Sequence, residues 1–120
     1  MKRIVALVTG SNRGIGKSCI EEFAKAGVDV VINYCHHKAE AEKLEKYISE
    51  TYNVNVLTIK CDVSKEEEVE NMVNEIVDKF GGIDILVNNA GVSRDSLLLD
   101  KNIKEFQRVL DVNYFSFFCL

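Results

Sequence analysis

Residues 4–16 read Ile-Val-Ala-Leu-Val-Thr-Gly-Ser-Asn-Arg-Gly-Ile-Gly, an apolar run followed by a glycine-rich turn. The apolar run does not alternate with polar residues, which is typical of a parallel strand that is covered on both faces. Apolar residues then recur at helical spacing from residue 15 to residue 24, and Gly27 favours the left-handed conformation that ends a helix. This order of strand, glycine turn and helix predicts the beginning of an α/β fold.

The same alternation continues along the rest of the chain. Three further strands are expected, at residues 28–32, 54–61 and 83–87. Amphipathic helices are expected at residues 41–52, 64–80 and 103–117, the last of which runs to the end of the sequence. Ser64 and Glu67 have the spacing of a capping box, which predicts the start of the second of these helices. Strands that alternate with helices require right-handed crossovers, so we expect a doubly wound parallel sheet with helices on both faces.

Composition limits the class of protein. The 120 residues are 47% apolar and 28% charged, which is typical of one globular domain, and no apolar run approaches the roughly 18 residues of a membrane span. The net charge of −4 does not favour general binding to nucleic acid or to an anionic membrane. The four cysteines form no C-x-x-C pair, which argues against a zinc site and against a disulfide scaffold. We therefore expect reduced thiols in a cytoplasmic protein.

The three glycines of the turn have distinct physical uses. Gly10 permits a sharp turn, Gly14 lets a phosphate approach the backbone, and Gly16 allows close packing of helix against strand. Free amides and the positive end of the helix dipole would then attract a pyrophosphate. The alternative is a plain glycine-rich turn, but the flanking strand and helix favour a nucleotide site. The spacing G-x-x-x-G-x-G differs from both the common G-x-G-x-x-G pattern and the phosphate loop of NTPases.

The motifs together resemble the short-chain dehydrogenase/reductase (SDR) family. They comprise Thr-Gly-Ser-Asn-Arg-Gly-Ile-Gly at residues 9–16, Asp-Val at 62–63, Asn-Asn-Ala-Gly at 88–91, and Asn113. Residues 84–113 are most similar to the 3-oxoacyl-(acyl-carrier-protein) reductase branch, notably in Gly-Val-Ser-Arg-Asp-Ser-Leu-Leu at 91–98. The resemblance implies a Rossmann-type doubly wound sheet with strand order 3-2-1-4, in one NAD(P)-binding domain that spans residues 1–120.

The resemblance also implies roles for individual residues. The glycine turn would hold the cofactor pyrophosphate, Asp62 and the Val63 amide would hold the adenine, and residues 89–91 would line the adenosine ribose. The implied residues are Gly10, Ser11, Asn12, Arg13, Gly14, Ile15, Gly16, Asp62, Val63, Asn89, Ala90 and Gly91. Asn113 would belong to an Asn-Ser-Tyr-Lys catalytic tetrad. Taken alone, Asn113 is a polar residue on an apolar stripe, which also fits a hydrogen-bonded core asparagine.

Cofactor choice depends on the end of the second strand, where the stretch Asn-Tyr-Cys-His-His-Lys begins with Asn33 and Tyr34. Both residues are expected to contact the cofactor. NAD enzymes place a carboxylate there to bind the ribose hydroxyl, and this stretch has none. Arg13 and Lys38 could face a phosphate, so we expect NADP(H) in preference to NAD(H). His36 and His37 are interpreted as a solvated loop, because two adjacent histidines do not make a metal site.

The catalytic Ser, Tyr and Lys that the resemblance implies would follow Asn113. Tyr34 and Lys38 match Y-x-x-x-K, but they precede Asn113 and lie at the adenosine end of the predicted site. We therefore expect a C-terminally incomplete domain that stops before its fifth strand. The parent would reduce a carbonyl, either a small ketone or a 3-oxoacyl thioester on acyl carrier protein, as a homodimer or homotetramer. The alternative is a non-catalytic nucleotide-binding remnant or interaction module.

Overall fold

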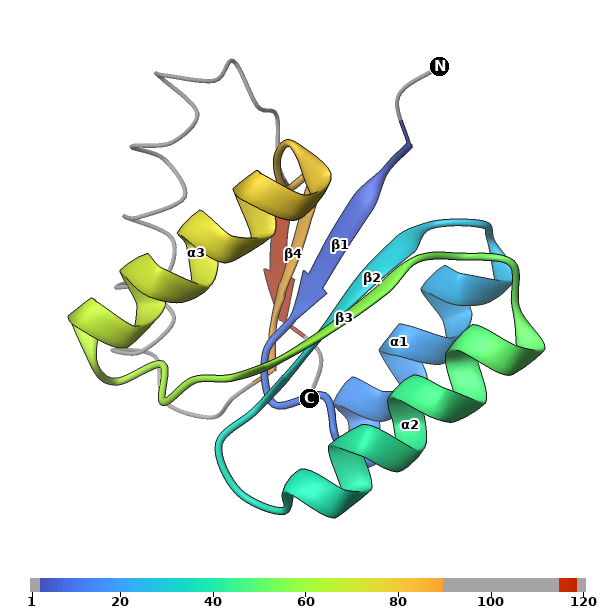
Figure 1. Cartoon of the computed structure of the whole chain (residues 1–120), viewed down its shortest axis with the longest axis horizontal. Coiled ribbons are helices and arrows are strands. Elements are labelled where there is room, and N and C mark those ends of the chain that lie inside the picture. Colours follow the sequence, from blue (N-terminus) through green and yellow to red (C-terminus); the bar gives the residue numbers. More distant parts are fainter. Residues whose placement is uncertain (1–2, 90–114, 119–120) are drawn as a thin grey trace.

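The structure is a computed structural model that describes residues 3–89 and 115–118. Strands and helices alternate along these residues (Figure 1). The strands are β1 (Val5–Val8), β2 (Asp29–Tyr34), β3 (Val56–Lys60), β4 (Ile85–Asn88) and β5 (Phe115–Phe118). The helices are α1 (Gly14–Lys25), α2 (Lys38–Thr51) and α3 (Glu66–Phe80).

The strands form one parallel sheet in the order β3-β2-β1-β4-β5. The predicted α/β class and the predicted order 3-2-1-4 are therefore confirmed. Val8 at the end of β1 pairs with Ile32 of β2 and with Val87 of β4. This register brings the carboxyl ends of the three strands to the same edge of the sheet, where parallel sheets bind their ligands.

The fifth strand corrects the sequence analysis, which predicted a helix to the end of the chain and a sheet that ended at β4. Instead, β5 pairs with β4 in parallel, with Phe115 opposite Ile85 and Phe118 opposite Asn88. A short aromatic run suits a strand as well as a helix, and periodicity alone does not separate the two. The remainder of that predicted helix, residues 103–114, lies outside the described residues.

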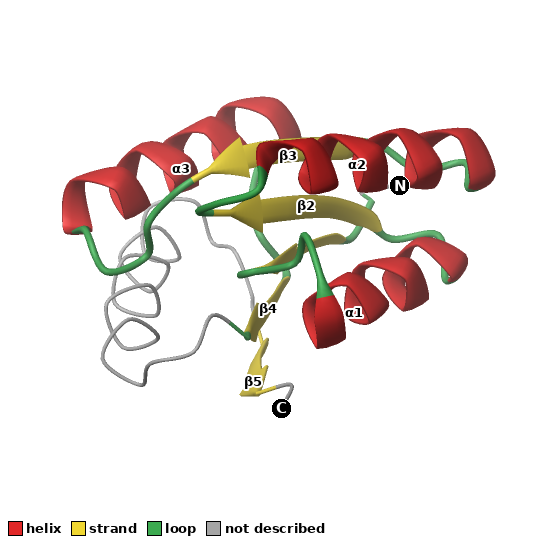
Figure 2. Cartoon of the chain, turned by 90° about the horizontal axis from the view of Figure 1, so that it is seen from below, coloured by secondary structure: helices red, strands yellow, loops and turns green. Residues whose placement is uncertain are grey.

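Helices cover both faces of the sheet, with α3 on one face and α1 and α2 on the other (Figures 1 and 2). Neighbouring strand residues point to opposite faces, so Leu7 packs in the core under α3 and Val8 packs in the core under α1 and α2. Both side chains are fully buried, as the continuous apolar run predicted. No helix among the described residues has the length and apolar composition needed to cross a membrane.

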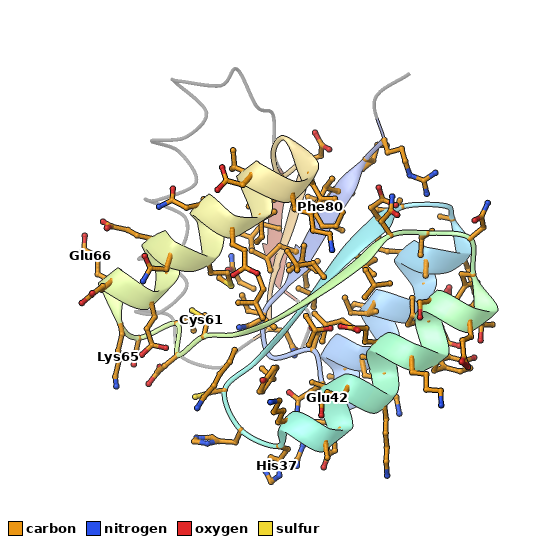
Figure 3. The ribbon with its side chains drawn as sticks, viewed as in Figure 1. His37, Glu42, Cys61, Lys65, Glu66 and Phe80 are labelled. Carbon is orange, nitrogen blue, oxygen red and sulfur yellow. The ribbon has the colours of Figure 1, made fainter. Side chains whose placement is uncertain are left out.

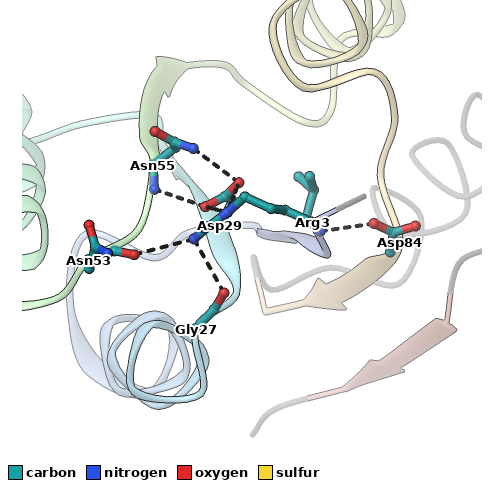
Figure 4. Close-up of polar contacts among 7 residues, drawn as sticks. Arg3, Gly27, Asp29, Asn53, Asn55 and Asp84 are labelled. Carbon is teal, nitrogen blue, oxygen red and sulfur yellow. Dashed lines mark hydrogen bonds and ion pairs between the residues drawn. The ribbon is translucent and has the colours of Figure 1, made fainter. Parts of the chain in front are cut away.

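A closed set of polar contacts joins the amino ends of the strands (Figure 4). Asp29 is 2% exposed, and its carboxylate accepts hydrogen bonds from Arg3 Nε at 2.9 Å and from the backbone N–H of Asn55 at 2.9 Å. Nearby, the carboxylate of Asp84 accepts the backbone N–H of Val5 at 2.9 Å. Buried carboxylates need such partners, so this set stabilises the sheet rather than offering a site.

The start of α3 also differs from the prediction. The helix begins at Glu66 after Lys65, and no side chain caps it. Ser64 does not form the predicted capping box, because its hydroxyl and its backbone N–H both donate to Asp62 Oδ1, at 2.6 and 3.0 Å. Asp62 therefore forms a tight turn just after β3, and the three glutamates of the first helical turn interact favourably with the helix dipole.

Candidate functional site

The glycine turn after β1 uses left-handed backbone conformations at two positions. Gly10 has φ of 60° and Gly14 has φ of 61°, a region that residues with a Cβ seldom adopt. A Cβ built on Gly14 would meet no atom of the described residues within 4 Å. Gly14 thus leaves an open approach to the backbone at the start of α1.

Gly16 has the opposite surroundings. A Cβ at this position would lie 2.6 Å from Asn89 Nδ2, 2.7 Å from the Gly10 carbonyl oxygen and 2.8 Å from Ser11 Cα. Two of these three atoms belong to the backbone of the turn and cannot move independently of it. The predicted use of Gly16, close packing of α1 against the strand ends, is therefore what the structure contains.

The end of β2 holds the turn from one side. β2 extends two residues beyond its predicted end, so Asn33 and Tyr34 are strand residues, 2% and 7% exposed. Asn33 Oδ1 accepts the backbone N–H of Gly10 at 3.0 Å, and Asn33 Nδ2 donates to the carbonyl of Cys61 at 3.2 Å. The Ser11 hydroxyl accepts the backbone N–H of Asn33 at 3.0 Å. Asn33 and Ser11 therefore position the turn through buried side chains.

The end of β4 holds the turn from the other side. Asn89 Nδ2 donates to the carbonyl of Gly10 at 3.2 Å, and the Asn89 backbone N–H donates to Thr9 Oγ1 at 2.9 Å. Thr9 is 2% exposed and directly precedes the turn. Gly10 is thus fixed by Asn33 through its N–H and by Asn89 through its carbonyl, which makes the turn a rigid element.

The start of α1 lacks the acidic residues that the other two helices have. Its first turn contains no acid, whereas α2 has Glu40 and α3 has three glutamates. The first N–H groups of a helix have no partner within the helix, and they favour a negative charge. Beside them, Ile15 is 46% exposed, although the sequence pattern had counted it with the apolar face of α1. The arrangement suits an anion attached to an apolar group.

Asp62 lies half-buried after β3. The hydrogen bonds from Ser64 to its carboxylate lower the pKa of Asp62, so the group is ionised at neutral pH. Both of these bonds use Oδ1. The adjacent Val63 is 7% exposed and packs in the core under α3. Cys61, placed between β3 and α3 in Figure 3, is 1% exposed, and burial raises the pKa of its thiol to about 12.

A groove of about 570 Å³ opens between the starts of α1 and α2. It is lined by Asn12, Arg13, Gly14, Lys17, Glu21, Glu40, Lys43, Leu44 and Tyr47. Asn12 Nδ2 donates to the carbonyl of His36 at 3.3 Å, which ties the glycine turn to the loop after β2. Arg13 forms an ion pair with Glu40, a residue that the sequence analysis did not consider.

The loop before α2 contains the paired histidines. His36 and His37 are exposed, and His37, at the start of α2 in Figure 3, has a left-handed φ of 65°. Lys38 is the exposed first residue of α2. Within the described part of the chain, no group of three His, Cys, Asp or Glu side chains is placed to hold a metal ion.

The predicted site residues from Gly10 to Gly16, together with Asn33, Tyr34, Asp62, Val63 and Asn89, all lie at or near the carboxyl ends of the strands. Ala90, Gly91 and Asn113 lie outside the described residues. The sequence analysis missed Thr9, which supports Asn89, and Glu40, which binds Arg13. A hydroxyl next to the first glycine offered a weak signal for Thr9. Glu40 is 27 residues from its partner, and its spacing gave no signal.

Comparison with known proteins gives consistent matches. A family model described as short chain dehydrogenase matches residues 4–120. The chain is 41% identical over 108 residues to 3-oxoacyl-(acyl-carrier-protein) reductase FabG from Staphylococcus epidermidis, in a match that covers 90% of this chain and 44% of that protein. The corresponding reductase from Synechocystis is 38% identical over 109 residues, covering 91% and 44%. The chain therefore spans less than half the length of these relatives.

Solved structures share the fold. L-sorbose reductase from Gluconobacter frateurii, solved with NADPH and L-sorbose, superposes with a TM-score of 0.81 at 28% identity, covering 90% of this chain and 49% of that one. A xylitol dehydrogenase solved with NAD⁺ gives a TM-score of 0.85 at 23% identity, covering 96% and 52%. The second likeness, at its lower identity, concerns the fold alone.

Proposed function

The chain belongs to the short-chain dehydrogenase family, and we propose that it is the nucleotide-binding, amino-terminal part of an NADP(H)-dependent reductase that converts a carbonyl to an alcohol. The observation that carries the proposal is the rigid glycine turn. Gly10 is held from both sides by the side-chain amides of Asn33 and Asn89, Gly14 leaves its surroundings open, and the first turn of α1 contains no acid. These residues fit a pyrophosphate.

Each part of the site would bind one part of the nucleotide. The backbone around Gly14 and the start of α1 would bind the pyrophosphate, and the exposed side chain of Ile15 would pack against the cofactor. The ionised carboxylate of Asp62 accepts hydrogen bonds, and both bonds from Ser64 use Oδ1, which favours a further donor at the adenine. Asn33 and Tyr34 would act by positioning, because their side chains are buried. Ala90 and Gly91 would line the adenosine ribose.

The preference for NADP(H) over NAD(H) rests on charge. Residues 33–38 contain no carboxylate, and the cationic residues Arg13 and Lys38 are both exposed. A guanidinium binds phosphate with two hydrogen bonds, which suits the 2′-phosphate that distinguishes NADP from NAD.

The relatives support the proposed substrate class. The activity for which these relatives are named supports a 3-oxoacyl thioester, bound to acyl carrier protein, as the substrate of the whole protein, with a simpler ketone as the alternative. NADPH, when bound, supplies a hydride to the carbonyl carbon. Asn113 would join a catalytic tetrad whose Tyr donates the proton and whose Lys lowers the pKa of that Tyr. We propose that Ser, Tyr and Lys lie beyond residue 120, and that the whole protein is a cytoplasmic homodimer or homotetramer.

Two measurements test this proposal. Titration of the protein with NADPH and with NADH, followed by nucleotide fluorescence, should give tighter binding of NADPH, and tighter binding of NADH would contradict the cofactor assignment. The protein extended to the length of its relatives should oxidise NADPH with an acetoacetyl thioester, whereas the 120-residue chain should not. An extended protein that binds NADPH but reduces no carbonyl would favour the non-catalytic module instead.

A further inference from the structure

The contact between Arg13 and Glu40 joins the glycine turn to the first turn of α2. Arg13 Nη2 lies 2.9 Å from Glu40 Oε1, and Arg13 Nε lies 3.2 Å from Glu40 Oε2. Two parallel hydrogen bonds between a guanidinium and a carboxylate fix the plane of the guanidinium. The side chains are 55% and 45% exposed, so both remain accessible to a ligand in the groove.

Glu21, the other acid that lines the groove, has partners of its own. Glu21 accepts hydrogen bonds from the hydroxyls of Tyr47 at 2.6 Å and of Tyr52 at 3.1 Å. Those bonds lower the pKa of Glu21 and hold its carboxylate against α2. Lys17 and Lys43 line the groove as well. Glu40 is therefore the lining acid that contacts the cation next to Gly14.

This contact has a consequence for phosphate binding. A phosphate that binds Arg13 must either share the guanidinium with Glu40 or displace it, and in both cases it meets the negative charge of that carboxylate. A nucleotide without a 2′-phosphate brings no second anion to Arg13, so the carboxylate affects it little. The geometry thus opposes the binding of a nucleotide that bears a 2′-phosphate, and it leaves the binding of a nucleotide without that phosphate unchanged.

We propose that Glu40 is a specificity-determining residue, which limits the preference for a nucleotide bearing a 2′-phosphate by occupying Arg13 and by placing a negative charge beside it. The inference rests on the proposed function, because it assigns the 2′-phosphate to Arg13. It differs from that function in its prediction: removal of an acid, rather than addition of a base, increases the preference for NADP(H).

The test compares Glu40→Gln with Glu42→Gln in binding measurements. Glu42 is an exposed acid two residues further along α2 (Figure 3), and it does not line the groove, so it controls for the general loss of one negative charge. Binding of 2′,5′-ADP and of 5′-AMP is measured by calorimetry, together with NADPH and NADH. These adenosine fragments report on this end of the site without any catalytic activity.

We expect Glu40→Gln to tighten the binding of 2′,5′-ADP and NADPH by about threefold to tenfold, as one charge near a phosphate does in a water-exposed site. Binding of 5′-AMP and NADH should change by less than about twofold. In an Arg13→Gln background the gain should be much smaller, because the effect requires Arg13. An equal gain for Glu42→Gln, or weaker binding of 2′,5′-ADP by Glu40→Gln, would overturn the inference.

The Arg13→Gln variant alone distinguishes the proposed cofactor assignment from the role of Glu40. If it weakens the binding of 2′,5′-ADP while Glu40→Gln has no effect, the assignment of NADP(H) stands and the role of Glu40 is wrong. If Arg13→Gln changes neither fragment and NADH binds more tightly than NADPH, the cofactor assignment itself fails, and the inference about Glu40 fails with it.

Discussion

The two ends of the sheet carry similar polar residues and use them differently. At the amino ends, Asp29 is surrounded by its donors Arg3 and Asn55 and is almost completely buried. At the carboxyl ends, the side-chain amides of Asn33 and Asn89 bind Gly10, while residues 13–15 of the turn are exposed. Burial and hydrogen bonding alone therefore do not identify a site. What distinguishes the carboxyl end is a rigid backbone with an open approach.

The largest effect on stability is expected at the amino end. Asp29→Ala removes a buried carboxylate and leaves the N–H of Asn55 without its acceptor. We expect the free energy of unfolding to fall by about 2 to 3 kcal/mol. This lies at the lower end of the range for breaking a buried ion pair, because Arg3 is half-exposed and water can hydrate it once Asp29 is removed. Urea denaturation measures this change. The affinity of the folded variant for NADPH should stay the same.

The control for Asp29 is Asp78→Ala, which removes an exposed acid from α3. A surface substitution of this kind should cost about 0.5 kcal/mol or less. If Asp29→Ala lost nucleotide affinity without losing stability, the amino-end cluster would have a role in binding, and the division between the two ends would be wrong.

The next largest effect is expected at Gly16, because this residue affects both the packing of α1 and the nucleotide site. Gly16→Ala places a Cβ within 2.8 Å of the Gly10 carbonyl and of Ser11 Cα, so the turn must move away from α1. We expect a loss of about 2 kcal/mol in the free energy of unfolding, typical of overpacking, together with a loss of NADPH binding. Glu22→Ala, an exposed substitution on the same helix that lies outside the groove, should change neither.

A smaller and more selective effect is expected from the glycines at the two ends of α1. Gly14 and Gly27 have φ of 61° and 82°, and within the part of the chain that the structure describes a Cβ on either would meet no atom within 4 Å. Gly14→Ala and Gly27→Ala should therefore each cost about 1 kcal/mol of stability through backbone strain. Only Gly14→Ala should weaken NADPH binding, by about tenfold or more, because its methyl group would occupy the space of the pyrophosphate.

The paired glycine variants are informative because the protein offers the two methyl groups the same free space. Thermal unfolding gives their stabilities, and fluorescence titration gives their affinities. Equal affinities for NADPH in both variants would show that the nucleotide does not approach Gly14, and they would remove the central support for the proposed site.

These comparisons also explain what the sequence could predict. The alternation of apolar runs and helical patterns is local, and together with the resemblance it was sufficient for the strand order β3-β2-β1-β4. The uses of Gly10 and Gly16 followed from their places between a strand and a helix. β5 was predicted as part of a helix, because a four-residue aromatic strand is too short for periodicity to identify.

The site was less predictable because its side chains pair across long sequence separations. Asn33 was expected to contact the cofactor, but its amide bonds to Gly10 and Cys61 inside the protein. The predicted capping box failed for a similar reason, since Asp62 engages Ser64 before the helix begins. Arg13 was predicted to face a phosphate, and its ion pair with Glu40 was not foreseen. Composition and spacing indicate which residues are present, and the fold decides which of them become partners.

The smallest expected effect concerns Cys35 and Cys61, which lie at the carboxyl ends of the strands. It involves no change in stability. Cys61 is buried, and its thiol, with a pKa raised to about 12, is almost entirely protonated at pH 8. Cys35 is half-buried in the loop after β2.

In a protein with Cys19→Ser and Cys119→Ser, iodoacetamide should therefore modify Cys35 well before Cys61, as measured by mass spectrometry of peptides. NADPH should slow the reaction of Cys35, which borders the predicted ribose site, and should slow Cys61 only as far as it stabilises the fold. Equal rates for the two thiols would mean that the carboxyl end opens on the timescale of labelling, and the rigid turn inferred from Asn33 and Asn89 would then be wrong.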